Sequence, residues 1–139
     1  MNRYAQYQQL STTSATRIDL LLALFDGAIE RIEEARSLIE QGRRDRALPL
    51  LVRAQMIVTE LAAGVVLDVA PEMNANILRL YEYVAFRLAE GTVEGLQSAA
   101  RVMSNLREGF RAIRAEAIEM ERRGEIPPAE SHSVVAALA

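Results

Sequence analysis

The protein has 139 residues, 50% of them hydrophobic, and its 16 basic and 19 acidic residues give a formal net charge of −3. This length predicts one domain with a sizeable core, and the absence of cysteine excludes disulfides and thiolate metal sites. Arginine or acid interrupts every long apolar run, so no membrane insertion is expected, and the mixed charges argue against nucleic-acid binding. Since residues 1–14 contain no recognisable signal peptide, the sequence predicts a cytoplasmic protein.

The chain opens with a polar segment, residues 1–15, which carries Tyr4 and Tyr7 and precedes a first predicted helix at residues 17–41. Thr16 is expected to cap this helix, with Asp19 reaching back in a variant of the capping box. Apolar residues recur along the helix at alternating steps of three and four, which is the helical period. They form a stripe that consists of Ile18, Leu21, Phe25, Ala28, Ile32, Ala35 and Ile39.

An Asp-Gly pair, Asp26-Gly27, interrupts the first helix. Such a pair flanked by apolar residues often marks a tight turn, but the helical period continues on both sides. Glycine inside a helix costs about 1 kcal/mol relative to alanine, so we expect Gly27 to let another helix or a bound segment approach the backbone. Asp26 either accepts hydrogen bonds, from a neighbouring chain end or from an arginine such as Arg53, or is solvated.

Three further helices are predicted, at residues 46–67, 72–90 and 93–123. Pro49 is expected in the first turn of the second helix, where its missing N–H matters least. The last of these helices carries the longest apolar seam, which comprises Leu96, Ala99, Met103, Leu106, Phe110, Ile113, Ala117 and Met120.

The predicted fold class is therefore all-α. Short connections between successive helices favour an antiparallel, up-and-down four-helix bundle over residues 16–124, preceded by a flexible N-terminal segment. Residues 125–139 are expected to form a mobile C-terminal tail, in which Val134, Val135 and Leu138 form at most a weak terminal turn.

The sequence offers no catalytic or metal-binding constellation. The only histidine, His132, lies in the predicted tail, whereas a di-iron bundle needs Glu-x-x-His motifs on two helices. No histidine or lysine is present in the body of the fold to activate a serine or threonine nucleophile. We therefore expect neither an enzyme nor a protein that needs a cofactor or metal.

The first two helices carry more apolar residues than one buried face requires. In the second helix, Leu50, Ile57 and Val66 lie outside the main stripe, which is formed by Ala47, Leu51, Ala54, Val58, Leu61 and Val65. A bundle helix needs only one apolar face. Two interpretations remain open at this point: a thick core, or a groove that takes a partner's helix.

Five segments in order resemble the flagellin export chaperones, the FliS family. "LFDGAIERI" at residues 24–32 resembles the signature of the family's first long helix, and "YAQ" at residues 4–6 resembles its N-terminal segment. "RAQMIVTEL" at residues 53–61 is similar to the second-helix motif. "LYEYVAFRL" at residues 80–88 and "LREGF" at residues 106–110 are similar to motifs of the last two helices.

The resemblance implies a chaperone that binds the disordered C-terminal segment of flagellin, prevents its premature polymerisation and assists its delivery to the flagellar type III export apparatus. The residues expected to bind the partner are Tyr4, Tyr7, Asp26, Gly27, Leu50, Ile57, Leu61 and Tyr83. Among these, Tyr4 and Tyr7 are expected to form a mobile flap over the groove. The alternative is a homodimerising adaptor or regulator without an export client, in which a second copy covers the surplus apolar surface.

Overall fold

The computed structural model describes residues 15–68, 70–127 and 131–139 of the chain. Within these residues the only regular secondary structure is helical, which confirms the all-α prediction. The helices are α2 (Arg17–Glu40), α3 (Arg44–Ala63), α4 (Pro71–Glu90), α5 (Val93–Ala112), α6 (Arg114–Arg122) and α7 (Ser131–Leu138).

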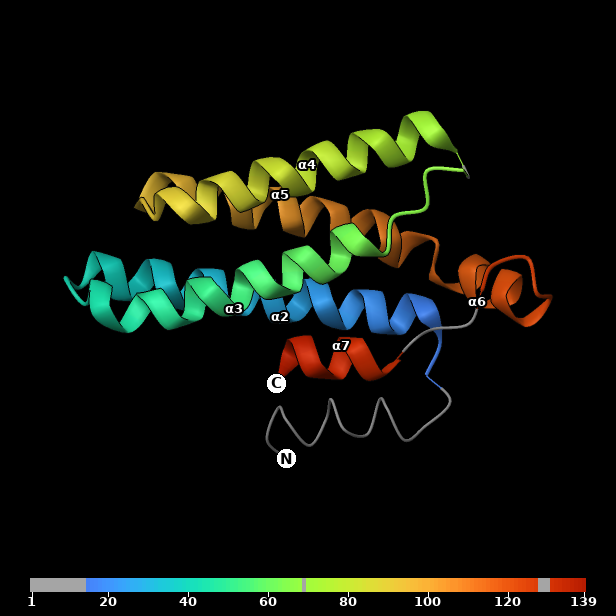
Figure 1. The fold of residues 1–139 in the computed structure, drawn as a ribbon, viewed down its shortest axis with the longest axis horizontal. Coiled ribbons are helices and arrows are strands. Elements are labelled where there is room, and N and C mark those ends of the chain that lie inside the picture. Colours follow the sequence, from blue (N-terminus) through green and yellow to red (C-terminus); the bar gives the residue numbers. More distant parts are fainter. Residues whose placement is uncertain (1–14, 69, 128–130) are drawn as a thin grey trace.

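The four longest helices pack in a closed ring of contacts. Helix α2 packs against α3 and α5, and α4 packs against the same two neighbours (Figure 1). A four-helix bundle fits this arrangement. The two short helices lie outside the ring, α6 against α2 and α5, and α7 against α2 and α3.

The core forms where the ring closes around Phe25 of α2. The ring centroid of Phe25 lies 6.3 Å from that of Tyr81 on α4 and 5.6 Å from that of Phe110 on α5. Burial in this apolar surrounding raises the pKa of the Tyr81 hydroxyl. The predicted stripes contribute most of the other buried residues of α2, α3 and α5, which include Ala28, Ile32, Ala35, Ala47, Leu51, Ala54, Val58, Leu96, Ala99 and Met103.

Threonine residues cap the N-termini of two of the four long helices. The Thr16 hydroxyl accepts a hydrogen bond from the Asp19 N–H at 3.3 Å, as predicted, and the Thr92 hydroxyl accepts one from the Gly95 N–H at 3.0 Å. Each bond satisfies a backbone donor that the first helical turn leaves free. Gly91 follows the last residue of α4, and its positive φ of 65° turns the chain sharply into α5.

The last predicted helix is not continuous. The Asp19 carboxylate, which also interacts with the Thr16 side chain, accepts two hydrogen bonds from Arg114, at 2.6 and 2.9 Å, and Glu121 accepts one from the Arg17 N–H at 2.8 Å. These contacts draw α6 over the start of α2, so the helix breaks at Ile113, which is 47% exposed. The expected seam from Ile113 to Met120 is therefore wrong, since α6 has no buried residue.

We expect the attachment of α6 to weaken in acid. The hydrogen bond from Arg114 holds the pKa of the Asp19 carboxyl below its ordinary value of 3.8. The stabilisation is complete above that ordinary pKa and disappears as the pH falls through the lower pKa of the folded state. In an acid titration followed by ¹⁵N–¹H NMR, the α6 amides of the wild type should therefore show a transition below pH 3.8 that Asp19→Asn lacks. The same transition in both proteins would contradict this assignment.

Helix α3 begins earlier and ends earlier than predicted. It starts at Arg44, so Pro49 lies inside the helix and not in its first turn. The helix tolerates this because Pro49 and Asp45, whose carbonyl loses its usual donor, are both exposed to solvent. The helix stops at Ala63, followed by Gly64.

The C-terminal region also differs from the expected mobile tail. Residues 131–138 form α7, in which Val134, Ala137 and Leu138 are 8%, 7% and 1% exposed. The reason is the apolar composition of the end of the chain, which gains burial by packing against α2 and α3.

Candidate functional site

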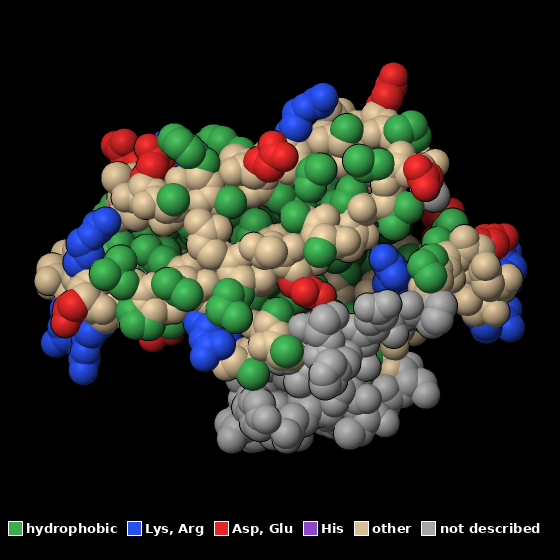
Figure 2. Space-filling model, in the orientation of Figure 1, with side chains coloured by type: hydrophobic (Ala, Val, Ile, Leu, Met, Phe, Trp, Pro, Cys, Tyr) green, Lys and Arg blue, Asp and Glu red, His purple; other side chains and the backbone are tan. Residues whose placement is uncertain are grey.

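Exposed apolar side chains gather on one part of the molecule. Of the ten large hydrophobic residues that are exposed within the described ranges, nine lie on α3, on α4 or between them. Figure 2 shows hydrophobic side chains over these two helices. Exposed apolar patches of this kind mark interaction surfaces more often than they mark chance exposure. The nine residues are Leu48, Val52, Met56, Val66, Leu67, Met73, Leu80, Tyr83 and Phe86.

Three of these residues form a ridge along α3. Leu48, Val52 and Met56 follow one another at steps of four, so they lie on one face of the helix. Their side chains are 48%, 59% and 45% exposed, although a neighbouring stripe of the same helix is fully buried. We call these three residues the α3 ridge.

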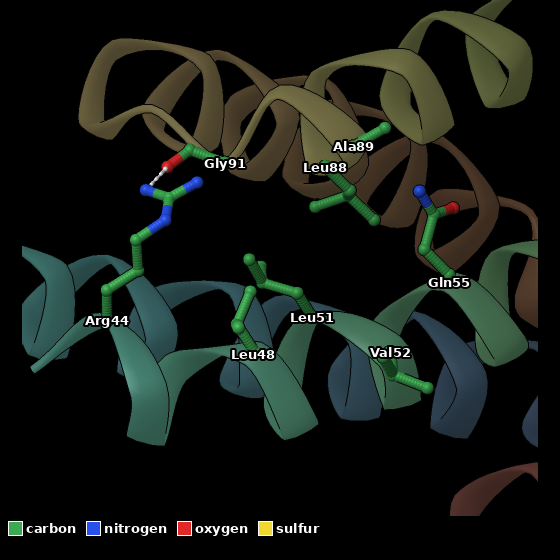
Figure 3. Close-up of a pocket in the computed structure, with 8 residues that line it drawn as sticks. All are labelled: Arg44, Leu48, Leu51, Val52, Gln55, Leu88, Ala89 and Gly91. Atoms are coloured by element: carbon green, nitrogen blue, oxygen red, sulfur yellow. Dashed lines mark hydrogen bonds between the residues drawn. The ribbon is translucent and has the colours of Figure 1, made fainter.

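A pocket of about 190 Å³ lies on one side of the α3 ridge, between α3 and α4 (Figure 3). Two hydrogen bonds connect the helices beside it: Arg44 Nη1 donates to the Gly91 carbonyl at 3.0 Å, and Gln55 Nε2 donates to the Ala85 carbonyl at 2.7 Å. The apolar lining comes from Leu48, Leu51, Val52, Leu88 and Ala89.

A larger hollow, of about 550 Å³, lies between α3 and α7. It is lined by Val52, Gln55, Met56, Thr59, Glu60, Ala136 and Ala137. Val52 and Gln55 line both hollows, so the α3 ridge stands between them. A ridge with a depression on each side can receive apolar side chains from an amphipathic partner helix.

The residues predicted for partner binding are only partly on this surface. Tyr83 is 40% exposed on α4, and its hydroxyl lies 2.6 Å from Ser98 Oγ. Ile57 and Leu61 belong to the core, at 0% and 2% exposed, and Leu50 is half-buried against it. The expectation that Ile57 lies outside the buried stripe of α3 is therefore wrong, while the part of Ile57 and Leu61 in partner binding stays a prediction. Tyr4 and Tyr7 lie outside the described residues.

None of the predicted partner-binding residues belongs to the α3 ridge, although the sequence carries a signal for it. Leu48, Val52 and Met56 form an apolar row at helical spacing, one position beyond the core residues Ala47 and Leu51. The two rows are adjacent on the helix, and periodicity alone does not tell which of them faces α2.

Gly27 is buried, and another helix approaches it closely, as its position inside a helix led us to expect. The Leu138 side chain of α7 lies where a Cβ at Gly27 would stand, and such a Cβ would also lie 3.4 Å from Ile57 Cδ1. Arg31 joins the two helices, because Nη1 donates to the Gly27 carbonyl at 3.0 Å and Nη2 donates to the Leu138 carbonyl at 2.7 Å. The neighbour is the chain's own C-terminal helix.

Asp26 forms an ion pair, but with a different arginine from the one suggested by the sequence. Arg107 Nη1 of α5 lies 2.9 Å from Asp26 Oδ1, and Arg111 Nη2 lies 3.9 Å from the same oxygen. The pair connects α2 to α5. Asp26 therefore lies away from the α3 ridge, in a structural contact.

Gly27→Leu is expected to release α7. The new side chain would occupy the place of Leu138, although leucine favours the helix over glycine by about 1 kcal/mol. In hydrogen exchange, the amides of residues 131–138 should lose protection while α2 to α5 keep theirs. Gly109→Leu is the matched control, since nothing lies within 4 Å of a Cβ at Gly109. Retained protection of α7 in Gly27→Leu would contradict this packing.

Two kinds of feature are absent from the described residues. No helix there combines the length and the apolarity that a membrane span needs. No group of three or more histidine, aspartate or glutamate side chains in those ranges is arranged to hold a metal ion.

Comparison with known proteins gives the family. A family model described as "Flagellar protein FliS" matches residues 1–117. The chain belongs to the FliS family. Two curated FliS proteins, both named "Flagellar secretion chaperone FliS", are similar over most of their length. The protein from Bacillus subtilis is 30% identical over 122 residues, covering 88% of this chain and 90% of the relative. The protein from Salmonella typhimurium is 29% identical over 126 residues, covering 86% and 93%.

The FliS match includes the whole of α2 to α5 and ends within α6. The α3 ridge, Gly27 and Arg31 thus lie inside the matched residues, whereas α7 lies beyond them.

Proposed function

We propose that this protein is a cytoplasmic flagellar secretion chaperone that binds the disordered C-terminal segment of flagellin. It prevents the segment from polymerising early and assists its delivery to the flagellar type III export apparatus. Membership of the FliS family, whose two compared members are named as secretion chaperones, carries this proposal. The role requires no catalytic step and no cofactor.

The exposed surface of α3 and α4 supports the same function. A disordered segment that folds into helices on binding must bury apolar residues to offset the entropy of ordering. The α3 ridge and its two hollows offer such residues. Wrapping a long segment on the chaperone would bury on the order of 2,000 Å² or more. We place the first contact of flagellin on the α3 ridge.

The fold that presents this surface is, in our proposal, an antiparallel up-and-down bundle. Gly42 and Gly91 sit in short connections, which bring successive helices back alongside one another. The exposed faces of α3 and α4 then form one continuous side of the molecule.

Size-exclusion chromatography with flagellin from the same genome tests the function against its alternative. A chaperone should elute alone as one species and form a one-to-one complex when flagellin is added. A homodimerising adaptor would use the α3 ridge for self-association, so it would elute as a stable dimer that ignores flagellin. The second result would overturn the proposed function.

A further inference from the structure

Helix α7 fills a site formed by α2 and α3 that has the features of a helix-docking groove. Its floor is Gly27, where the absent side chain leaves room for Leu138, and Ile57 lies beside it. Arg31 binds the carbonyl of Leu138, at the end of α7, where the helix dipole is negative. We call Gly27, Arg31 and Ile57 the α7 site.

The contacts that hold α7 in the α7 site do not depend on a particular α7 sequence. The Arg31 contact reaches a backbone carbonyl, which any helix end offers, and the floor accepts an apolar side chain above a glycine. Gly27 and Arg31 lie within residues matched by the FliS family model, whereas α7 lies outside them. The α7 site and α7, which occupies it, are therefore separable parts of the chain.

Helix α7 is also a weak occupant on physical grounds. It has eight residues, whereas an isolated helix shorter than about 12 residues is marginal in water, so its helical state depends on docking. Docking buries only three of the side chains that the structure describes, Val134, Ala137 and Leu138. A longer amphipathic helix that buries more apolar surface in the same place would replace it.

The α7 site is continuous with the proposed flagellin surface. Ala136 and Ala137 of α7 form one wall of the hollow whose opposite wall includes Val52 and Met56 of the α3 ridge. Removal of α7 would join this hollow to the floor at Gly27 and Ile57. The result would be one apolar trough that runs from the α3 ridge to α2.

We propose that α7 is a displaceable internal ligand, which a helical part of the flagellin C-terminal segment replaces when the client binds. The client helix places an apolar side chain over Gly27 and offers a backbone carbonyl to Arg31. In the free protein α7 keeps Ile57 covered. This inference rests on the proposed function, and it gives Gly27 and Ile57 a role in partner binding that opens only after α7 leaves.

Leu138→Lys tests the displacement, because it puts a cation into an apolar contact beside Arg31 and so undocks α7. We expect the variant to bind a flagellin C-terminal peptide at least tenfold more tightly than the wild type in isothermal titration calorimetry. Ala139→Lys is the matched control, since Ala139 is exposed just beyond the end of α7 and lines neither hollow, and it should bind no more tightly than the wild type.

Gly27→Leu should change the affinity for the flagellin peptide in the opposite direction. It also undocks α7, but it fills the floor of the site, so peptide binding should weaken at least tenfold. Equal effects of Leu138→Lys and Gly27→Leu, or unchanged affinity in Leu138→Lys, would overturn the displacement and leave the proposed function standing. If neither the wild type nor Leu138→Lys binds the peptide, the proposed function fails and the displacement fails with it.

Hydrogen exchange on the wild type gives an answer that does not depend on any variant. Addition of saturating flagellin peptide should remove protection from residues 131–138. Protection of these amides that persists in the complex would overturn the proposal.

Discussion

Val52→Glu is expected to weaken binding of the flagellin C-terminal segment by at least about tenfold, which corresponds to about 1.4 kcal/mol. Val52 is the most exposed residue of the α3 ridge, at 59%, and it lines both hollows. A glutamate there would stay hydrated in the free protein but would have to lose water against an apolar partner helix. The thermal melt should change little, since exposed substitutions usually alter stability by less than about 0.5 kcal/mol.

Ile113→Glu is the control for the Val52 variant. Ile113 is also apolar and exposed, at 47%, but it lies at the break between α5 and α6 and not on α3 or α4. Calorimetric titration of the peptide should give the wild-type affinity for Ile113→Glu. If both variants bind as the wild type does, the α3 ridge is not the contact surface.

Ile57→Glu should destabilise the fold strongly. Ile57 has 0% exposure and lies in the core cluster beside Gly27 and Leu138. Burial of an unpaired carboxylate in such a place costs about 4 kcal/mol or more, a large part of the 5–15 kcal/mol that stabilises a typical domain. Circular dichroism should show a melting temperature lowered by more than about 10 °C.

Ile57→Val separates the effect of lost packing on stability from the effect of a buried charge at the same position. It removes one methylene and should cost only about 1 kcal/mol. An Ile57→Glu variant that melts like the wild type would show that Ile57 faces solvent, as the sequence alone had suggested, and would contradict the core described here.

The sequence predicted α2, α3, α4 and the start of α5 to within a few residues, because their apolar stripes have a clear period and their ends carry Thr16, Thr92 and Gly91. It did not predict the break at Ile113. That break depends on Arg114 and Asp19, which are far apart in the chain and meet only after folding. Periodicity contains no information about such contacts.

The binding surface was harder to predict than the fold. Helix α3 carries apolar residues in several adjacent rows, and the choice of the buried row depends on its neighbours. Helix α7 covers the part of α3 near Gly27 and so draws Ile57 into the core, while Val52 stays open. Because α7 is short and gains its stability from docking, its own residues carry only a weak helical signal.

Methyl NMR of the five methionines tests most directly whether flagellin binds on the α3 ridge. Met56 lies on the ridge at 45% exposure, whereas Met120 lies on α6 and serves as an internal control. We expect the ¹³C-labelled Met56 methyl signal to shift on titration with the flagellin C-terminal peptide and to saturate at one equivalent, while the Met120 signal stays in place. An unchanged Met56 signal at saturating peptide would contradict flagellin binding on the α3 ridge.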